Sequence, residues 1–127
     1  MTDLEDPVRA YFDAINAEDW DALAGLWEPD AELHPAGGRP RHGREAIVAY
    51  YPRLLAGWAE HTDQPGRRIT EASTVVVEIA FTGTTGEGRS VAFDAVDLFD
   101  LAGPRIRRLS IWYDTAAVLR QVQGRWG

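Results

Sequence analysis

One aspartate in the sequence has neighbours that could give its carboxyl group unusual acid–base chemistry. Alternation along residues 90–101 predicts a strand with one face made of Val91, Phe93, Ala95, Asp97 and Phe99. Because Asp97 shares this face with apolar residues only, loss of hydration should raise its pKa. The carboxyl group could then stay protonated near neutral pH and donate a hydrogen bond. A bulge would change this arrangement, and Asp97 could instead cap a turn or pair with Arg108.

Two other side chains are candidates for a general base. His34 ends a short extended piece at residues 31–34, directly before Pro35, and imidazole groups exchange protons near neutral pH. A lone histidine is, however, more often a structural group. Asp114 precedes a predicted last segment, where it could cap a helix or act as a base at a pocket mouth. His42 and His61 stand in polar contexts and are expected to be solvated.

Aromatic residues are more numerous than a minimal core needs, which favours walls around a flat or polycyclic ligand. Tyr11 lies on the apolar stripe of a predicted helix, so its hydroxyl could point into a cavity, although a plain core tyrosine is an equal alternative. The candidate pocket residues are Trp20, Trp27, Trp58, Phe93, Trp112 and Tyr113. Core filling or a dimer interface would explain these rings equally well.

Composition removes several kinds of chemistry. All 13 basic residues are arginine and the chain has no cysteine, so lysine Schiff-base, P-loop lysine and thiolate mechanisms are excluded. The net charge of -7 argues against nonspecific nucleic-acid binding, which needs clustered positive charge. The histidine spacing fits no metal motif, and no G-x-G-x-x-G joins a strand to a helix. The sequence therefore predicts neither a metal nor a cofactor.

The elements that must position these residues form an α+β pattern, with helices first and antiparallel strands after them. Apolar spacing predicts helices at residues 4–15, from Asp19 to Pro29, and at 44–59. Extended segments are expected at 67–72, 74–84, 90–101 and 105–113, and residues 115–122 could form a helix or extend the sheet. A length of 127 residues suits one domain spanning residues 1–127.

The chain is expected to be cytoplasmic, with no membrane segment. Its first residues are acidic, whereas a secretory signal needs a basic start followed by an apolar run. No stretch approaches the roughly 18 to 20 apolar residues that a membrane-spanning helix requires.

Four segments together resemble the nuclear-transport-factor-2-like superfamily, especially the SnoaL-like polyketide cyclases and the ketosteroid isomerases. These segments are residues 8–23, 30–35 and 42–47, and residues 96–100 with Arg105 and Ile106. The resemblance covers nearly the full length and implies a cone-shaped, curved antiparallel sheet wrapped around N-terminal helices with an internal pocket. It also implies a homodimer through the open face of the sheet, for which Trp112 is a candidate contact.

The resemblance assigns roles to individual residues. Tyr11 and Asp97 match the tyrosine and the aspartic acid that form the oxyanion hole of ketosteroid isomerases. His34 before Pro35 stands near that family's catalytic aspartate, and Asp114 near the base of SnoaL-like cyclases. The leading hypothesis is thus a cofactor-independent isomerase or cyclase acting on a small hydrophobic carbonyl compound. The alternative is a non-catalytic module of the same fold that binds a ligand or a protein partner.

Overall fold

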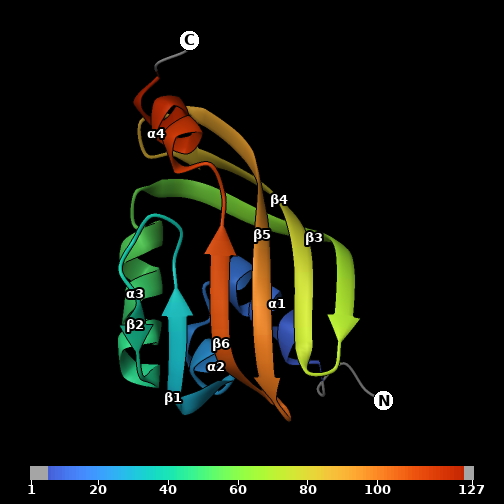
Figure 1. The fold of residues 1–127 in the computed structure, drawn as a ribbon. Helices are drawn as coiled ribbons and strands as arrows, with labels where there is room; N and C mark the ends of the chain where they lie inside the picture. The colour runs from blue at the N-terminus through green and yellow to red at the C-terminus, as the bar shows by residue number, and fades with distance from the viewer. Residues whose placement is uncertain (1–5, 125–127) are drawn as a thin grey trace.

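The structure is a computed structural model that describes residues 6–124, and it has the predicted α+β architecture. In chain order the elements are α1 (Pro7–Ala17), α2 (Trp20–Ala24), β1 (Trp27–His34), β2 (Arg41–His42), α3 (Arg44–Leu55), β3 (Trp58–Glu71), β4 (Thr74–Thr85), β5 (Ser90–Ala102), β6 (Arg105–Trp112) and α4 (Thr115–Gln123). Within residues 6–124 the strands form one six-stranded sheet in the order β2-β1-β6-β5-β4-β3 (Figure 1). Neighbouring strands are antiparallel except for β1 and β6, which pair in parallel.

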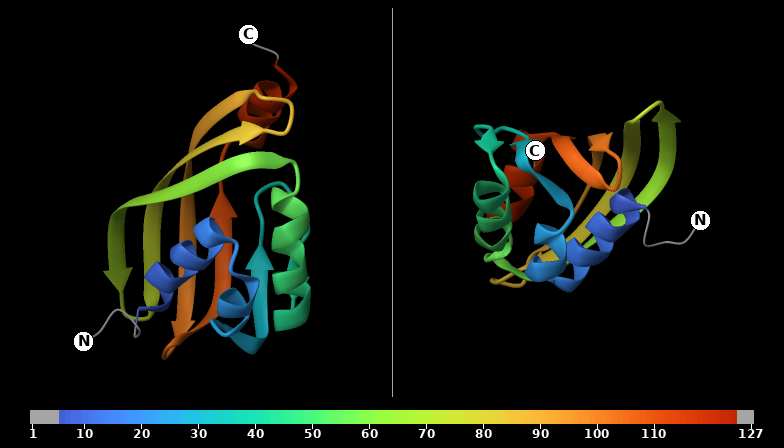
Figure 2. Two further views of the ribbon diagram at one scale, coloured as in Figure 1. Left: turned by 180° about the vertical axis from the view of Figure 1, so that it is seen from behind. Right: turned by 90° about the horizontal axis from the view of Figure 1, so that it is seen from below.

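The sheet curves around α1 and α2, which cover one of its faces, while α3 packs against β1 (Figure 2). Strand β3 follows α3 and crosses the molecule on the side of the sheet where α1 lies. It then bends to run beside β4 (Figures 1 and 2). Its pairing with β4 shifts register between Trp58 and Glu60 and again between Pro65 and Arg68. The core joins the buried stripe of α1 to the inward faces of β1, β4, β5 and β6.

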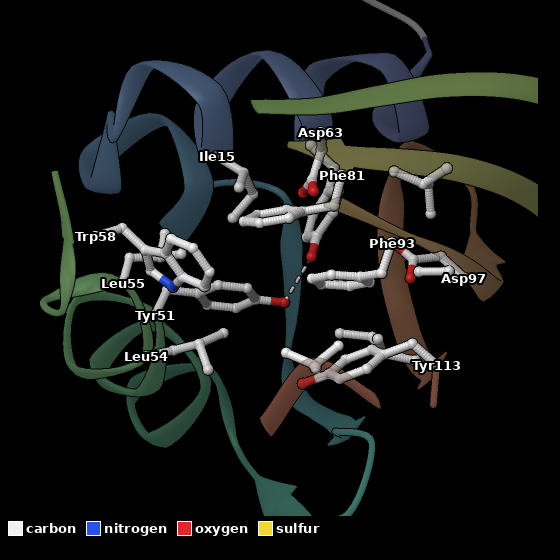
Figure 3. Close-up of a pocket in the computed structure, with 15 residues that line it drawn as sticks. Ile15, Tyr51, Leu54, Leu55, Trp58, Asp63, Phe81, Phe93, Asp97 and Tyr113 are labelled. Carbon is white, nitrogen blue, oxygen red and sulfur yellow. Dashed lines mark hydrogen bonds between the residues drawn. The ribbon is translucent and has the colours of Figure 1, made fainter. Parts of the chain in front are cut away.

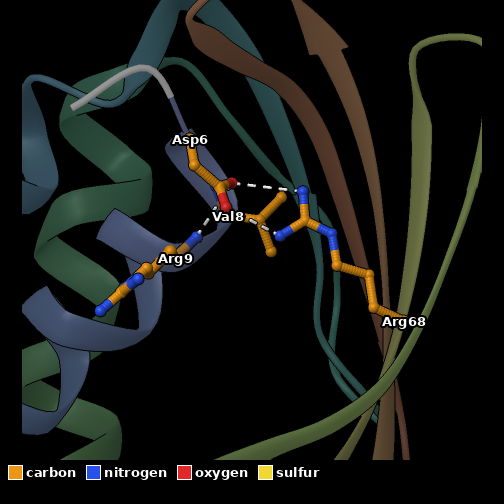
Figure 4. A network of polar contacts seen from close by, with 4 residues as sticks. All are labelled: Asp6, Val8, Arg9 and Arg68. Carbon is orange, nitrogen blue, oxygen red and sulfur yellow. Dashed lines mark hydrogen bonds and ion pairs between the residues drawn. The ribbon is translucent and has the colours of Figure 1, made fainter. Parts of the chain in front are cut away.

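Local capping fixes the start of α1. The Asp6 side chain accepts hydrogen bonds from the backbone N–H groups of Val8 and Arg9, at 3.1 and 3.3 Å, and Pro7 occupies the first turn. The Arg68 guanidinium also binds this carboxylate and so ties the start of α1 to β3 (Figure 4). The helix therefore begins at Pro7, and the predicted apolar position Leu4 lies outside the described residues.

The second helix is much shorter than predicted. It ends at Ala24, and the chain is already in β1 at Trp27, which pairs with Ile106 of β6. The backbone N–H of Ile106 donates to the Leu26 carbonyl oxygen at 2.7 Å. Strand pairing and full burial of Trp27 thus outweigh the helical spacing of the apolar residues.

The third helix also ends early, at Leu55, and the strand predicted at 67–72 begins nine residues sooner, at Trp58. Strand β3 hydrogen-bonds to one neighbour only, β4, and most of its side chains are exposed, so it lacks the alternation that marks a strand. An edge position also tolerates Pro65 within the strand. Strands β4, β5 and β6 confirm the predicted ranges closely, and residues 115–123 form a helix.

Candidate active site

A cavity of about 220 Å³ lies between the helices and the concave side of the sheet (Figure 3). It is lined by side chains from α1, α3, β3, β4, β5, β6 and α4. The lining residues are Tyr11, Ile15, Tyr51, Leu54, Leu55, Trp58, Asp63, Ile79, Phe81, Phe93, Ala95, Asp97, Ile111, Tyr113 and Val118. Its polar groups are therefore three tyrosine hydroxyls, one indole N–H and two carboxyls, and no basic side chain of the described chain lines it.

Aromatic rings form a continuous wall of this cavity. Trp58 meets Phe81 edge to face at 5.0 Å between ring centroids, and Phe81 stacks on Phe93 at 4.6 Å. Phe93 in turn contacts the Tyr113 ring at 4.9 Å. Because these rings hold one another, the wall is rigid and suits a flat ligand.

Two tyrosine hydroxyls meet in the lining of the cavity. The hydroxyl oxygens of Tyr11 on α1 and Tyr51 on α3 lie 2.8 Å apart, and both residues are buried. Burial is the main cause that raises the pKa of both phenols well above the usual value, so both stay protonated. When one hydroxyl donates to the other, the second keeps its own hydrogen for a ligand.

Asp97 occupies the inward face of β5, which confirms the burial predicted from strand alternation, and it is only 4% exposed. Burial, aided by the negative charge of Asp63, raises its pKa well above the usual value. Asp97 pairs in register with Ile111, while Arg108 lies opposite Asp100, so the predicted alternative of an Arg108 pair does not arise. No hydrogen bond joins the Asp97 carboxyl to any other described residue, which leaves it available to a ligand.

The second carboxyl of the cavity, Asp63, was not predicted from the sequence. Burial raises its pKa to about 6, against a smaller opposing effect of His61. The Asn16 side chain fixes the backbone of Asp63, since its amide donates to the carbonyl oxygen at 2.9 Å and its oxygen accepts from the N–H at 2.8 Å. The side-chain oxygens of Asp63 have no hydrogen-bond partner in residues 6–124.

His61 lies two residues before Asp63, on the same side of β3. Its imidazole is 4% exposed and its Nε2 lies 2.7 Å from a carboxylate oxygen of Glu18. The prediction that His61 is solvated is therefore wrong, because the end of α1 packs against this part of the strand. His42, in contrast, is exposed as expected.

Both predicted bases lie away from the cavity lining. His34 belongs to β1, where its Nε2 contacts Glu32 at 3.0 Å. Asp114 accepts a hydrogen bond from the Ala117 N–H at 2.9 Å and caps α4, so of its two predicted roles it takes that of a helix cap.

Of the six predicted pocket aromatics, Trp58, Phe93 and Tyr113 line the cavity. Trp27 is fully buried in the core, and Trp20 stacks on the Tyr51 ring without lining the cavity. Trp112 alternates to the opposite face of the sheet and is 64% exposed. Core filling, one of the alternative interpretations, therefore accounts for Trp27 and Trp20, whereas Trp112 lies on the surface.

Among residues 6–124, no cluster of three or more histidine, aspartate and glutamate side chains could hold a metal ion. In the same range, no helix has the length and apolar character to cross a membrane.

The sequence profile of the SnoaL-like domain matches residues 8–109, which is most of the chain. The protein belongs to the SnoaL-like domain family. No curated protein matches the sequence significantly.

Several solved structures share the fold of this SnoaL-like protein at low sequence identity. A nuclear-transport-factor-2-like protein of unknown function from Burkholderia pseudomallei has a TM-score of 0.86 and 21% identity, with 96% of this chain and 98% of that chain covered. A protein from Catenulispora acidiphila with a ketosteroid isomerase-like fold, in complex with trimethylamine, has a TM-score of 0.84 and 23% identity, with 95% and 96% covered. IdmH from Streptomyces antibioticus, a proposed polyketide cyclase, has a TM-score of 0.82 and 20% identity, with 96% and 99% covered.

Proposed function

We propose that this SnoaL-like protein is a cofactor-independent enzyme that moves a proton on a small, neutral, hydrophobic carbonyl compound. The observation that carries the proposal is the Asp97 carboxyl, which is 4% exposed, lines an apolar cavity and has no hydrogen-bond partner in the described chain. A polar group in an apolar cavity costs free energy unless it makes a hydrogen bond, either with water or with a ligand. Asp63 supplies a second carboxyl in the same cavity.

The two carboxyls suit opposite roles. Asp63, with a pKa of about 6, is mostly ionised at neutral pH and can act as a general base. Asp97 has the more strongly raised pKa, stays protonated and can donate a hydrogen bond. This division follows the general pattern in which two titratable groups in different environments serve as base and acid. Asp63 thus takes the role that the sequence assigned to His34 or Asp114, neither of which lines the cavity.

The reaction begins when Asp63 removes a proton from the carbon next to a carbonyl group. The electrons of the broken C–H bond form an enolate, whose negative charge gathers on oxygen. Asp97 and the free hydrogen of the Tyr11 and Tyr51 hydroxyl pair donate hydrogen bonds to this oxygen. Such donors, fixed in an apolar cavity, stabilise the transition state more strongly than water does.

Two outcomes complete the cycle without any added oxidant or reductant. In an isomerase, protonated Asp63 returns the proton to a different carbon and the double bond moves. In a cyclase, the enolate carbon forms a bond with a second carbonyl carbon of the same molecule, and the proton passes to that carbonyl oxygen. A cavity of about 220 Å³ is below the roughly 300–1,000 Å³ typical of ligand pockets, which favours substrates of one or two rings.

Deuterium exchange tests this proposal without knowledge of the natural substrate. A panel of one- and two-ring ketones is incubated with the protein in heavy water, and deuterium at the carbon next to the carbonyl is measured by mass spectrometry. We expect exchange above the buffer rate for at least one ketone. The matched control is Asp94→Asn, which removes an exposed carboxyl from the opposite face of the same strand and should leave exchange unchanged. Binding of the ketones without any exchange would instead support a non-catalytic binding module.

We also propose that the open face of the sheet forms a homodimer. Trp112 and Ile69 are 64% and 50% exposed on the strands of this sheet, and burial of such side chains favours association. Sedimentation at micromolar concentration should give twice the monomer mass, and Trp112→Arg should shift it to monomer. A wild-type monomer under these conditions contradicts the dimer.

A further inference from the structure

The charge of the cavity lining has only one sign. Two of its side chains are acidic, Asp63 and Asp97, and none of the described lining residues is basic. The basic side chain whose charge lowers the pKa of Asp63 is His61. Its ring nitrogen already contacts Glu18 at 2.7 Å. At neutral pH the cavity therefore holds a carboxylate that no side chain of residues 6–124 neutralises.

The Asp97 carboxyl provides a second observation that points to a ligand. It is 4% exposed, lines the same cavity and makes no hydrogen bond with the described chain. An ionised carboxylate without a partner in apolar surroundings is energetically costly. A ligand that carries a positive charge would remove this cost for Asp63 and would lower the pKa of Asp97.

The rest of the lining also suits a positive charge. Six aromatic residues line the cavity: Tyr11, Tyr51, Trp58, Phe81, Phe93 and Tyr113. Aromatic ring faces attract cations, and several rings around one ammonium group form a recognised binding arrangement when water is excluded. Alkyl groups on the cation would contact the aliphatic part of the lining, which includes Leu54, Leu55 and Ile111.

We propose that the cavity binds a small alkylammonium ion, with its charge against Asp63 and its alkyl groups against the aromatic wall. This binding function does not depend on the proton-transfer proposal, because it needs an ionised Asp63 but no donor to an oxyanion. It disfavours anionic ligands such as phosphates and carboxylates, which the ionised Asp63 would repel.

The affinity for such a cation should depend on pH. The titratable groups that act on Asp63 or feel its charge are Tyr11 of α1, Tyr51 of α3, His61 of β3 and Asp97 of β5. The phenols stay neutral, so ionisation of Asp63 sets the charge of the site. Affinity should rise as pH increases through about 6 and should level off above it.

Choline and its neutral isostere 3,3-dimethyl-1-butanol provide a direct test by calorimetric or NMR titration. At about pH 8 the wild type should bind choline at least about tenfold more tightly than the alcohol, and this preference should shrink at about pH 5. Asp63→Asn should abolish the preference, whereas Asp94→Asn should keep it. The pH series needs no variant, so it tests the proposal even if Asp63→Asn folds poorly. Equal binding of choline and alcohol, absence of choline binding, or a preference unchanged by both pH and Asp63→Asn would overturn it.

The same protein samples separate this inference from the enzyme proposal. Ketone exchange without a preference for choline would overturn only the cation site. A choline preference without exchange of any ketone would leave the cation site and contradict the proton-transfer reaction.

Discussion

The two faces of the sheet use the same side chain in different ways. On the concave face Asp97 is buried among apolar neighbours and has no partner in residues 6–124, whereas on the convex face of the same strand Asp94 is exposed and Asp100 accepts a hydrogen bond from Thr74 at 2.8 Å. These aspartates lie three residues apart along β5. The face of the strand, rather than the residue type, therefore decides which carboxyl is buried in the cavity. Substitutions on the two faces should therefore have very different effects.

The largest expected effect is that of Asp63→Asn on ketone exchange. This variant keeps the size of the side chain but removes the base, so the exchange rate should fall by about 10²–10⁴-fold. Mass spectrometry of the deuterated ketone gives the rate, with Asp94→Asn as the convex-face control. A rate within about threefold of wild type would show that another group removes the proton.

Asp97→Ala should have the next largest effect. Loss of one donor to the enolate oxygen should lower the exchange rate by about 10²–10³-fold. It should also weaken the binding of phenols, which mimic an enolate, while Asp97→Asn should recover part of the loss because its amide can donate. Fluorescence titration with a series of substituted phenols measures this, and unchanged phenol affinity in Asp97→Ala would contradict the oxyanion role.

The raised pKa of Asp63 should also make the stability of the protein depend on pH. The pKa of Asp63 is raised to about 6 in the folded protein from an ordinary value of 3.8, so the folded state binds more protons between these values. The free energy of unfolding therefore falls as pH rises through this window, by about 3 kcal/mol at most, and it stays lower above the window. Urea unfolding between about pH 4.5 and pH 8 should show this loss in wild type and Asp94→Asn. In Asp63→Asn the contribution of Asp63 is absent, so the free energy of unfolding should fall less over the same pH range. Equal pH dependence of all three proteins would argue against a raised pKa of Asp63.

The smallest predicted effect concerns Asn16, which holds the backbone of Asp63 in place without lining the cavity. Asn16→Ala should lower kcat for exchange by about tenfold with little change in KM, because the base is displaced but the ligand contacts remain. Asn16→Asp should keep one of the two hydrogen bonds and add a negative charge, so the pH at which activity appears should move upward. A changed KM with an unchanged pH profile would indicate only a structural role.

Each part of the site that could be predicted from the sequence lies on a single helix or strand whose pattern shows its orientation. Strand alternation placed Asp97 inward, and helical spacing placed Tyr11 on the buried stripe of α1. These patterns report the face of a residue from its immediate neighbours in the chain. They also sufficed for the fold class and for strands β4 to β6.

The parts that were missed depend on contacts between distant segments. Asp63 faces the cavity because the end of α1 binds β3 through Asn16, at a separation of 47 residues, and the local sequence of this exposed edge strand carries no such signal. The Tyr51 hydroxyl joins the site through Tyr11, 40 residues away. Trp27 and Trp112 were misplaced for a related reason, since β1 pairing and the face of β6 decide their environments.

The pH dependence of ketone exchange shows whether Asp63 removes the proton, because it reports the ionisation of this base during the reaction. For the wild type we expect kcat/KM to rise with pH and to reach half its maximum near pH 6, where Asp63 ionises. The rise near pH 6 should be absent from the residual activity of Asp63→Asn. Exchange that does not depend on pH between about 5 and 8, or no exchange of any ketone above the buffer rate, would contradict the account.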